Sequence, residues 1–164
     1  TAAIYDRRCE VAIATEAPRQ DDILSVSFAA QRIVAVVAPG HPLVKRTPPL
    51  SLADIAAHAV IFRPPPSLTQ QKIETSLRLH GLNIAPIVTL GTREALIEAV
   101  TQGIGVGFIF ELATNRHEGL VRLPVVELAE THREDVFCLA PYRRRRAVAA
   151  LFDIAEEFSV GLSG

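Results

Sequence analysis

The chain has 164 residues, of which 49% are hydrophobic and 21% charged, and its formal net charge is -1. This is the composition of a soluble globular protein, long enough for one good core or for two small lobes. The charge excludes a general electrostatic attraction to nucleic acid, and the apolar runs are too short to span a membrane. Thr1 follows no methionine and residues 2–8 resemble the end of a helix, so we expect a fragment of a longer protein.

The two cysteines, Cys9 and Cys138, lie within short apolar runs, and their spacing does not require a disulfide. Such surroundings favour buried thiols that act as small hydrophobic side chains. A redox switch is the less favoured alternative, because a sensing thiol needs exposure and a lowered pKa. A reducing cytoplasm is the simplest setting for this chain.

Short apolar segments predict the strands of the first part of the chain. These segments are residues 9–14, 23–28 and 33–38, and the third ends at the turn Pro39-Gly40-His41-Pro42. Ser51, with Asp54 three residues later, then predicts a capped short helix that reaches Ala57.

The next segment predicts a strand followed by a helix. The strand covers residues 58–62, and Arg63-Pro64-Pro65-Pro66 continues it as a stiff, extended connection. Ser67 is expected to cap the helix in a capping box with Gln70, and Gly81 is expected to end it.

A strand–helix–strand unit follows between Pro86 and Phe110. Residues 87–90 are rich in β-formers, Thr92 begins an amphipathic helix, and Gly103 ends that helix. The almost wholly apolar run 104–110 is typical of a strand that is buried on both faces of a parallel sheet.

The end of the chain predicts two more strands, over residues 120–123 and 135–139, and an amphipathic helix that follows four consecutive arginines. The arginine run favours a solvated face that pairs with acids such as Glu156 and Glu157 over a phosphate site. Strands alternate with helices throughout, which predicts an α/β fold with mostly parallel pairing.

The motifs of catalysis and of cofactor binding are missing from this sequence. It contains no nucleophile elbow, zinc-protease motif, paired-cysteine motif or phosphate-binding loop, and its five histidines share no metal-ligand spacing. The glycines at positions 103, 105 and 107 do not form a dinucleotide fingerprint, because that motif follows a strand and opens a helix, whereas here a helix precedes a strand. Gly105 and Gly107 instead favour close packing of the strand against helices. We therefore expect no enzyme activity, no cofactor and no metal.

Hydroxyl side chains do gather where strands end. Ser67 and Thr69 open one helix, Thr92 opens another, and Thr15 ends the first strand. In a wound α/β sheet these positions lie at the edge where ligands collect, and a helix start favours an anionic group. Each hydroxyl alone is explained by capping. Together, they predict a binding cleft for a small anion.

Several stretches of the chain resemble the effector-binding domain of LysR-type transcriptional regulators. They are C-E-V-A-I-A-T-E, I-V-A-V-V-A-P-G-H-P-L, S-L-A-D-I-A, S-L-T-Q-Q-K-I-E with H-G-L, and T-R-E-A-L-I-E-A-V-T-Q-G-I-G-V-G-F-I. The resemblance covers nearly the whole chain in the same order. The segment I-A-T-E is similar to the sulfur-assimilation branch of that family, whose effectors include small anions.

The resemblance implies a two-lobed fold like that of periplasmic binding proteins. Residues 1–30 and 131–164 would form the first lobe, and residues 31–130 the second. The strand–helix–strand portion that opens the first lobe in that family is missing here, so the first lobe would be incomplete. The residues that line the effector cleft would be Thr15, Ser67, Thr69 and Thr92, with Arg63 and Phe110 nearby.

The resemblance also implies a function. The domain would bind a small, anionic effector between its lobes and control transcription in the cytoplasm as a homo-oligomer. DNA would be bound only through a helix-turn-helix domain that this chain does not contain. Two alternatives stay open from the sequence: a solute-binding protein of a transporter, and an enzyme built on the same scaffold.

Overall fold

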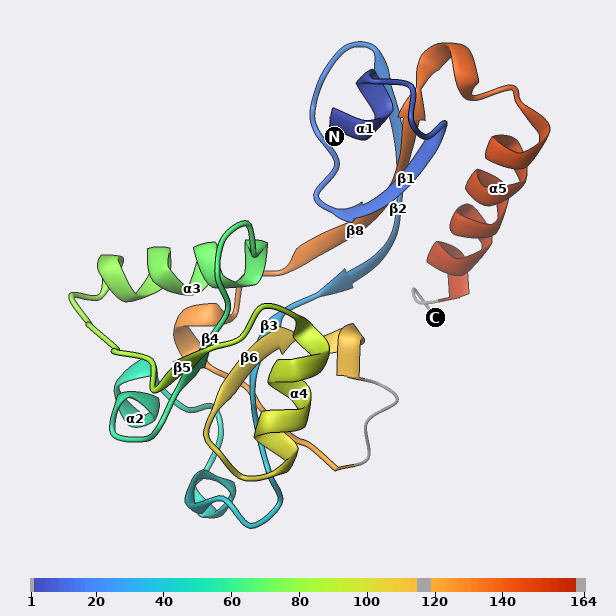
Figure 1. The fold of residues 1–164 in the computed structure, drawn as a ribbon. Coiled ribbons are helices and arrows are strands. Elements are labelled where there is room, and N and C mark those ends of the chain that lie inside the picture. The colour runs from blue at the N-terminus through green and yellow to red at the C-terminus, as the bar shows by residue number, and fades with distance from the viewer. Residues whose placement is uncertain (1, 115–118, 162–164) are drawn as a thin grey trace. The chain divides into compact units, whose positions relative to one another are not determined.

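The computed structural model describes residues 2–114 and 119–161, and the chain divides into two compact units. Unit 1 consists of Thr1–Gln31 with Thr131–Gly164, and unit 2 is the continuous segment Arg32–Glu130. The helices and strands follow in this order: α1 (Ala2–Tyr5), β1 (Val11–Thr15), β2 (Ile23–Gln31), β3 (Ile33–Val37), α2 (Leu52–Ala56), β4 (Ile61–Phe62), α3 (Leu68–Leu79), β5 (Val88–Thr89), α4 (Arg93–Thr101), β6 (Gly107–Phe110), β7 (Val121–Leu123), β8 (His132–Leu139) and α5 (Arg146–Gly161) (Figure 1).

Unit 2 is organised around β3. This strand pairs antiparallel with β6 on one side and with β7 on the other. A parallel bridge between Val60 and Val106 connects β6 to the β4 segment, and β4 pairs in parallel with β5. Strand β5, helix α4 and strand β6 therefore form a crossover, with β4 lying between the two strands.

Both faces of the β3 region are covered. Its alternate residues Ile33, Ala35 and Val37 pack into one apolar cluster, together with residues of α2 and α3. Val34 and Val36 pack into a second cluster on the opposite face, which α4 covers. All five residues of β3 are consequently buried.

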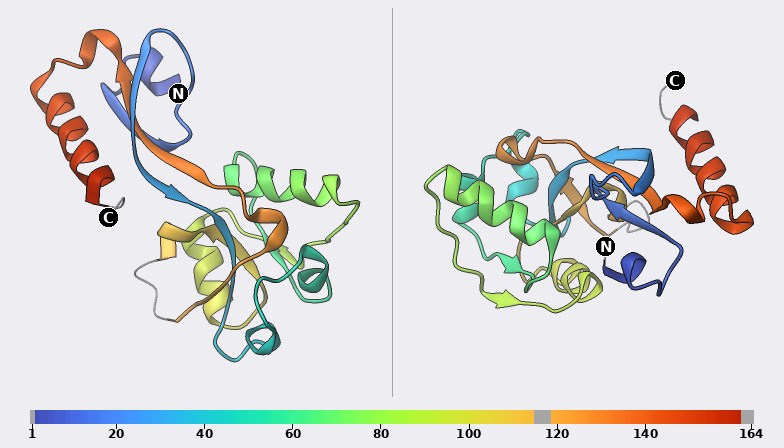
Figure 2. Two further views of the ribbon diagram at one scale, coloured as in Figure 1. Left: turned by 180° about the vertical axis from the view of Figure 1, so that it is seen from behind. Right: turned by 90° about the horizontal axis from the view of Figure 1, so that it is seen from above.

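Unit 1 has a three-stranded sheet in the order β1-β8-β2, with both pairs antiparallel. Successive residues of β8 again face opposite sides. Val136 and Cys138 pack against Val148, Phe152 and Ala155 of α5. Phe137 lies in a separate cluster with Ile4 of α1. Helix α5 runs beside β2 and β8 in both views of Figure 2.

The expected α/β fold class is confirmed, but the expectation of mostly parallel pairing is wrong. Apart from the parallel β4–β5 pair, the paired strands of the described residues are antiparallel. The apolar run 104–110 pairs antiparallel with β3 and meets the β4 segment through one parallel bridge. Its strand is buried because helices cover both faces of the sheet, and burial of that kind does not depend on the direction of the neighbouring strand.

The helix starts follow the sequence closely. Ser51 forms the expected capping box with Asp54, and Thr92 accepts a hydrogen bond from the Ala95 N–H at 3.1 Å. Ser67 also caps its helix, but Gln70 does not complete the box, because its side-chain oxygen accepts from the Arg63 N–H. Gly81 and Gly103 end α3 and α4 with φ of 65° and 75°, the left-handed conformation that favours glycine.

The arginine run packs on aromatic rings and pairs with acids. Arg143 stacks on the Phe152 ring and lies 3.9 Å from carboxylate oxygens of Asp153 and Glu156, so the expected pairing with acids is confirmed for this residue. Arg145 stacks on Tyr142 and pairs with Glu10.

The two cysteines, Cys9 and Cys138, are free thiols. Burial raises the pKa of Cys138, which disfavours the reactive thiolate.

Candidate functional site

The candidate site in unit 2 is the edge of the sheet where β4 and β5 end. The two strands are parallel and adjacent, with Ile61 opposite Val88 and Phe62 opposite Thr89. Each strand leads into a helix, β4 into α3 and β5 into α4. The starts of these two helices therefore lie at one edge, as the sequence predicts, and their partial positive charges add there.

The hydroxyls at this edge differ in exposure. Ser67 is buried and its oxygen accepts a hydrogen bond from the Gln70 N–H at 3.3 Å. Thr92 is exposed although it caps α4. Thr69 lies within the first turn of α3 and is half-buried. Of the three, Thr92 is thus the hydroxyl most accessible to a ligand.

Arg63 directly follows β4 at the same edge. Its backbone N–H donates to the Gln70 side chain at 3.2 Å, which ties it to the first turn of α3. Its Nε is buried and has no hydrogen-bond partner among the described residues. A buried donor without a partner is costly, and a charged donor particularly so. An incoming acceptor at this atom would therefore be favoured.

A pocket of about 520 Å³ opens beside Arg63, between α3 and the segment that leads into β5. Pockets of this size commonly hold small molecules. Most of its lining is apolar, with Phe62 and Leu77 among the side chains, while Arg63, Arg78 and Glu74 add charge. Ser67, Thr69 and Thr92 do not line it. Arg63 is thus the one predicted site residue that lies in this pocket.

The start of α4 already holds one carboxylate in its charged form. The pKa of Glu94 is lowered, first by a hydrogen bond from its own backbone N–H and then by Arg93 and Arg63. The charge of Arg63 is the smallest of these causes, and the backbone N–H at the start of α4 is the largest. The start of α4 therefore favours the charged form of this carboxyl.

Unit 1 presents a different environment around Thr15. The Thr15 hydroxyl and the Gln31 side-chain amide both donate to the Glu134 carboxylate. The neighbouring residue Glu16 has a positive φ of 57°, and its carboxylate lies 2.7 Å from the buried His132 ring. Thr15 therefore lies among carboxylates, which would repel an anion.

Asp135 completes this polar region of unit 1. Its buried carboxylate accepts hydrogen bonds from the Ala17 N–H at 2.8 Å and from the Ser27 hydroxyl at 2.5 Å. The guanidinium of Arg133 lies 3.9 Å away. These bonds fix the chain that follows Thr15 and hold β2 to β8.

The predicted site residues are therefore only partly brought together. Arg63, Ser67 and Thr92 share one edge of the sheet in unit 2. Phe110 ends β6, which is parallel to the β4 segment at their bridge, and its half-buried ring packs against the main core cluster. Thr15 belongs to unit 1 and is already hydrogen bonded.

Sequence reasoning missed the acidic partners of the site. Glu134 and Glu16 were not singled out, because Glu134 contacts Thr15 across 119 positions of the chain and no local pattern reports that contact. Glu94 carried a signal that could have found it, since it lies in the first turn of a helix capped by Thr92.

None of the helices in the described part of the chain is both long and apolar enough to cross a membrane.

Comparisons with known proteins agree with this architecture. The family model of the LysR substrate binding domain matches residues 1–159. The chain is 29% identical over 106 residues to the HTH-type transcriptional regulator CfxR of Cupriavidus necator, covering 65% of this chain and 33% of that protein. It is 33% identical over 103 residues to an uncharacterized HTH-type transcriptional regulator of Methanocaldococcus jannaschii, covering 59% of this chain and 34% of that protein. The chain thus spans about a third of the curated relatives it matches.

Solved structures with a similar fold include two regulator domains with bound small molecules. The regulatory domain of Synechocystis CcmR in complex with 2-PG has a TM-score of 0.83 at 19% identity, over 96% of this chain and 77% of that one. The effector-binding domain of QuiR in complex with shikimate has a TM-score of 0.78 at 19% identity, over 98% of this chain and 76% of that one. At these identities the likeness shows the fold.

Proposed function

This chain belongs to the LysR substrate-binding domain family, and on that premise we propose that it is the effector-sensing part of a DNA-binding transcriptional regulator. Units 1 and 2 would be the two lobes of this domain, with boundaries near residues 31 and 131. Operator DNA would be bound elsewhere in the complete regulator, as in the HTH-type relatives.

We propose that the effector is a small anion held at the edge of unit 2. The observation that carries this proposal is the buried Nε of Arg63, which has no hydrogen-bond partner among the described residues and lies where two helices begin. A carboxylate or phosphate group would accept from Arg63 and would be stabilised by the helix starts. Shikimate, the ligand named for QuiR, carries a carboxylate and therefore supports this class of effector.

The other predicted residues would surround this anchor. Thr92 would donate its exposed hydroxyl to the anion, while Ser67 and Thr69 would shape the start of α3 around it. Phe110 would provide an apolar wall. Thr15, which is paired with Glu134, would recognise a hydroxyl or another hydrogen-bond donor of the effector, because a carboxylate beside it disfavours an anion.

Effector binding would control transcription through a population shift. A ligand that binds one state of the regulator better than another shifts the equilibrium by its difference in affinity. A coupling of about 1–3 kcal/mol suffices for this purpose. We also propose that the domain is not catalytic, and that the regulator acts in the cytoplasm as a homo-oligomer, as regulators of DNA transcription commonly do.

The complete regulator allows a direct test. Thermal-shift measurements with a panel of small carboxylates and phosphates would identify a ligand, and calorimetry would give its affinity. Thr92→Ala is expected to weaken binding by at least about tenfold, as loss of one hydrogen bond to a charged group does. Thr15→Ala is expected to weaken it less. Unchanged affinity in both variants would show that the proposed site is wrong.

The same experiment separates regulation from catalysis. The ligand is expected to change the affinity of the regulator for its operator DNA, measured by fluorescence anisotropy, and to be recovered unaltered after incubation. A ligand that is chemically converted, or that leaves DNA binding unchanged, would contradict the proposed function.

A further inference from the structure

The pocket beside Arg63 has more room than a single anionic group needs. Its volume of about 520 Å³ lies in the range of pockets that hold whole small molecules. The proposed anchor at Arg63 accounts for one charged group of a ligand. The rest of the lining therefore bears on the remainder of that ligand.

The floor of this pocket is apolar and belongs to the core of unit 2. Phe62, Leu77 and Ile84 line it, and all three are buried members of the main core cluster. Leu82 adds a half-buried wall that packs against the same cluster. Because core side chains are close-packed, they keep their places whether or not a ligand is bound. The floor is therefore a preformed apolar surface.

The charged residues of the lining leave one positive charge in excess. The buried side chain of Gln70 accepts from the Arg63 N–H at 3.2 Å and donates to the Glu74 carboxylate at 3.0 Å, which fixes Glu74 beside the pocket. Arg78 follows Glu74 by four positions on α3, a spacing at which opposite charges attract each other. Arg63 is then the excess charge, and it matches one carboxylate better than two.

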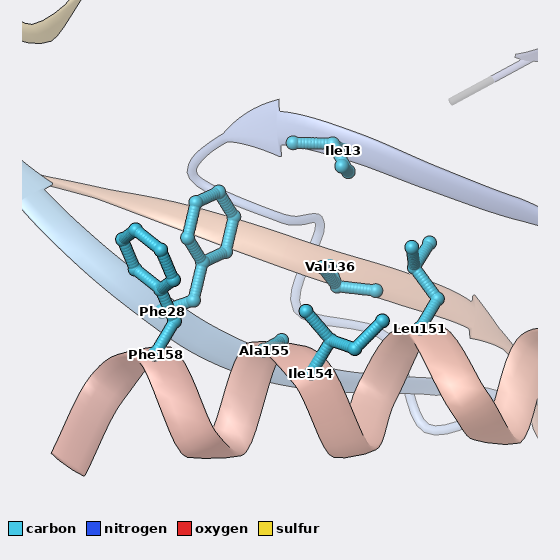
Figure 3. A pocket seen from close by; sticks show the side chains of 7 residues that line it. All are labelled: Ile13, Phe28, Val136, Leu151, Ile154, Ala155 and Phe158. Carbon is cyan, nitrogen blue, oxygen red and sulfur yellow. The ribbon is translucent and has the colours of Figure 1, made fainter. Parts of the chain in front are cut away.

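The apolar groove beside α5 in unit 1 provides a contrast (Figure 3). Its lining, which includes Leu151 and Phe158, carries no charge and has nothing that would select an anion. The pocket of unit 2 instead combines an apolar floor with a buried donor that lacks a partner among the described residues. This combination suits a molecule that is charged at one end and apolar along the rest.

We infer that the effector is an organic monocarboxylate with an apolar body, and that this body lies on the floor of the pocket. Its carboxylate would accept from Arg63, and its hydrocarbon part would contact Phe62 and Leu77. The Glu74 carboxylate would disfavour a second negative charge on the ligand. An inorganic anion would leave the floor uncovered. The inference rests on the proposed anion site and adds the chemical class of its ligand.

A chain-length series tests the carboxylate and the apolar body separately. Calorimetry with the complete regulator would measure the affinities of butyrate, hexanoate and octanoate. Affinity is expected to rise about tenfold at each step, because each step buries two further methylene groups. Arg63→Gln is expected to lower all three affinities by a similar factor, about tenfold or more, and to leave the steps between them unchanged.

The two readouts can fail independently. Equal affinities along the series, all dependent on Arg63, would overturn this inference and leave the anion site standing. Affinities that rise with chain length but ignore Arg63→Gln would overturn the anion site and this inference together.

Matched leucine substitutions locate the apolar body. Leu82→Ala trims the wall of the pocket and is expected to lower octanoate affinity about fivefold, with a smaller change for butyrate. Leu79→Ala is the control, because Leu79 is 77% exposed at the end of α3 and does not line the pocket. Leu151→Ala tests the groove of unit 1. Loss of octanoate affinity in Leu151→Ala and not in Leu82→Ala would overturn the inference.

Photolabelling keeps the test decisive if Leu82→Ala is unstable. An octanoate analogue with a diazirine on its chain would be cross-linked to the wild-type regulator, and the labelled peptide identified by mass spectrometry. The label is expected within residues 62–89 and should disappear when octanoate is added in excess. Label found instead on β1, β2 or α5, or label that octanoate does not displace, would overturn the inference.

Discussion

Units 1 and 2 both combine helices with a sheet, yet they bury their apolar residues very differently. In unit 2 the strand β3 is buried along its whole length, because α2 and α3 cover one face of its sheet and α4 the other. In unit 1 the edge strand β1 is only half-buried, and one apolar face of α5 is exposed. Among the described residues, helices thus cover both faces of the unit 2 sheet, whereas unit 1 leaves apolar side chains of β1 and α5 exposed.

The tyrosines make this comparison measurable. Tyr5 and Tyr142 are the two tyrosines of the chain, which has no tryptophan, and both belong to unit 1. Intrinsic tyrosine fluorescence therefore reports the unfolding of unit 1, whereas circular dichroism reports the helices of both units.

Matched leucine truncations should give the largest difference. Leu96 in α4 is 1% exposed, whereas Leu151 in α5 is half-buried and lines an apolar groove together with the exposed Ile154 and Phe158. Leu96→Ala is expected to lower the free energy of unfolding by about 2–5 kcal/mol, because it leaves a cavity in a closed core. Leu151→Ala is expected to cost less than half as much. Equal losses in urea unfolding, followed by circular dichroism and fluorescence, would contradict the difference in burial between the two helices.

The close packing of unit 2 predicts the next largest effect. A Cβ at Gly105 would lie 2.5 Å from the Ala59 carbonyl oxygen, which is part of the backbone and has little freedom to move. Gly105→Ala is expected to cost about 1–3 kcal/mol. The control is Gly91→Ala, where a Cβ meets nothing within 4 Å, and it should lie within about 0.5 kcal/mol of the wild type. Similar unfolding midpoints for both variants would refute the tight contact.

Helix capping in unit 2 predicts a smaller effect. The Ser51 hydroxyl accepts from the Asp54 N–H at 3.1 Å, and the Asp54 carboxylate accepts from the Ser51 N–H at 2.9 Å. Ser51→Ala is expected to cost about 1 kcal/mol in urea unfolding, and Ser51→Thr to restore most of it. If threonine were as damaging as alanine, the capping hydrogen bond would not be the cause.

The pH dependence of unit 2 is the smallest expected effect. Burial, followed by the nearby His58, lowers the pKa of His41 from its usual 6.5. Below that pH the unfolded chain takes up a proton more readily than the folded chain. The contribution of His41 is therefore fully present above pH 6.5 and is lost as the pH falls.

His41→Asn retains an acceptor for the Leu43 N–H, which the ring Nδ1 accepts at 3.3 Å. The variant is expected to lose stability less steeply than the wild type between about pH 7 and pH 5, measured by urea unfolding at each pH. A steeper loss in the variant would contradict the sign of the shift.

Local features of the sequence predicted local structure well. Ser51, Thr92 and Gly103 mark helix ends because capping and positive φ depend on residues only a few positions apart. The direction of strand pairing was predicted wrongly, because an apolar run reports burial and not the orientation of its neighbour.

The candidate site was less accessible to sequence reasoning for the same physical reason. The hydrogen bond of Thr15 with Glu134 and the buried, unpartnered Nε of Arg63 both depend on contacts that only the folded chain creates. Their role in effector binding remains a prediction.

The most direct test of the proposed anion site is the effect of Arg63 on ligand affinity. Calorimetry would compare the wild-type regulator with Arg63→Gln, and with Arg46→Gln as a control for the loss of one positive charge in unit 2, since Arg46 pairs with Asp54 at the surface. Binding of a small carboxylate from the panel is expected to weaken at least about tenfold in Arg63→Gln and to stay within about twofold of the wild type in Arg46→Gln. Equal affinities in Arg63→Gln and the wild type would contradict the account.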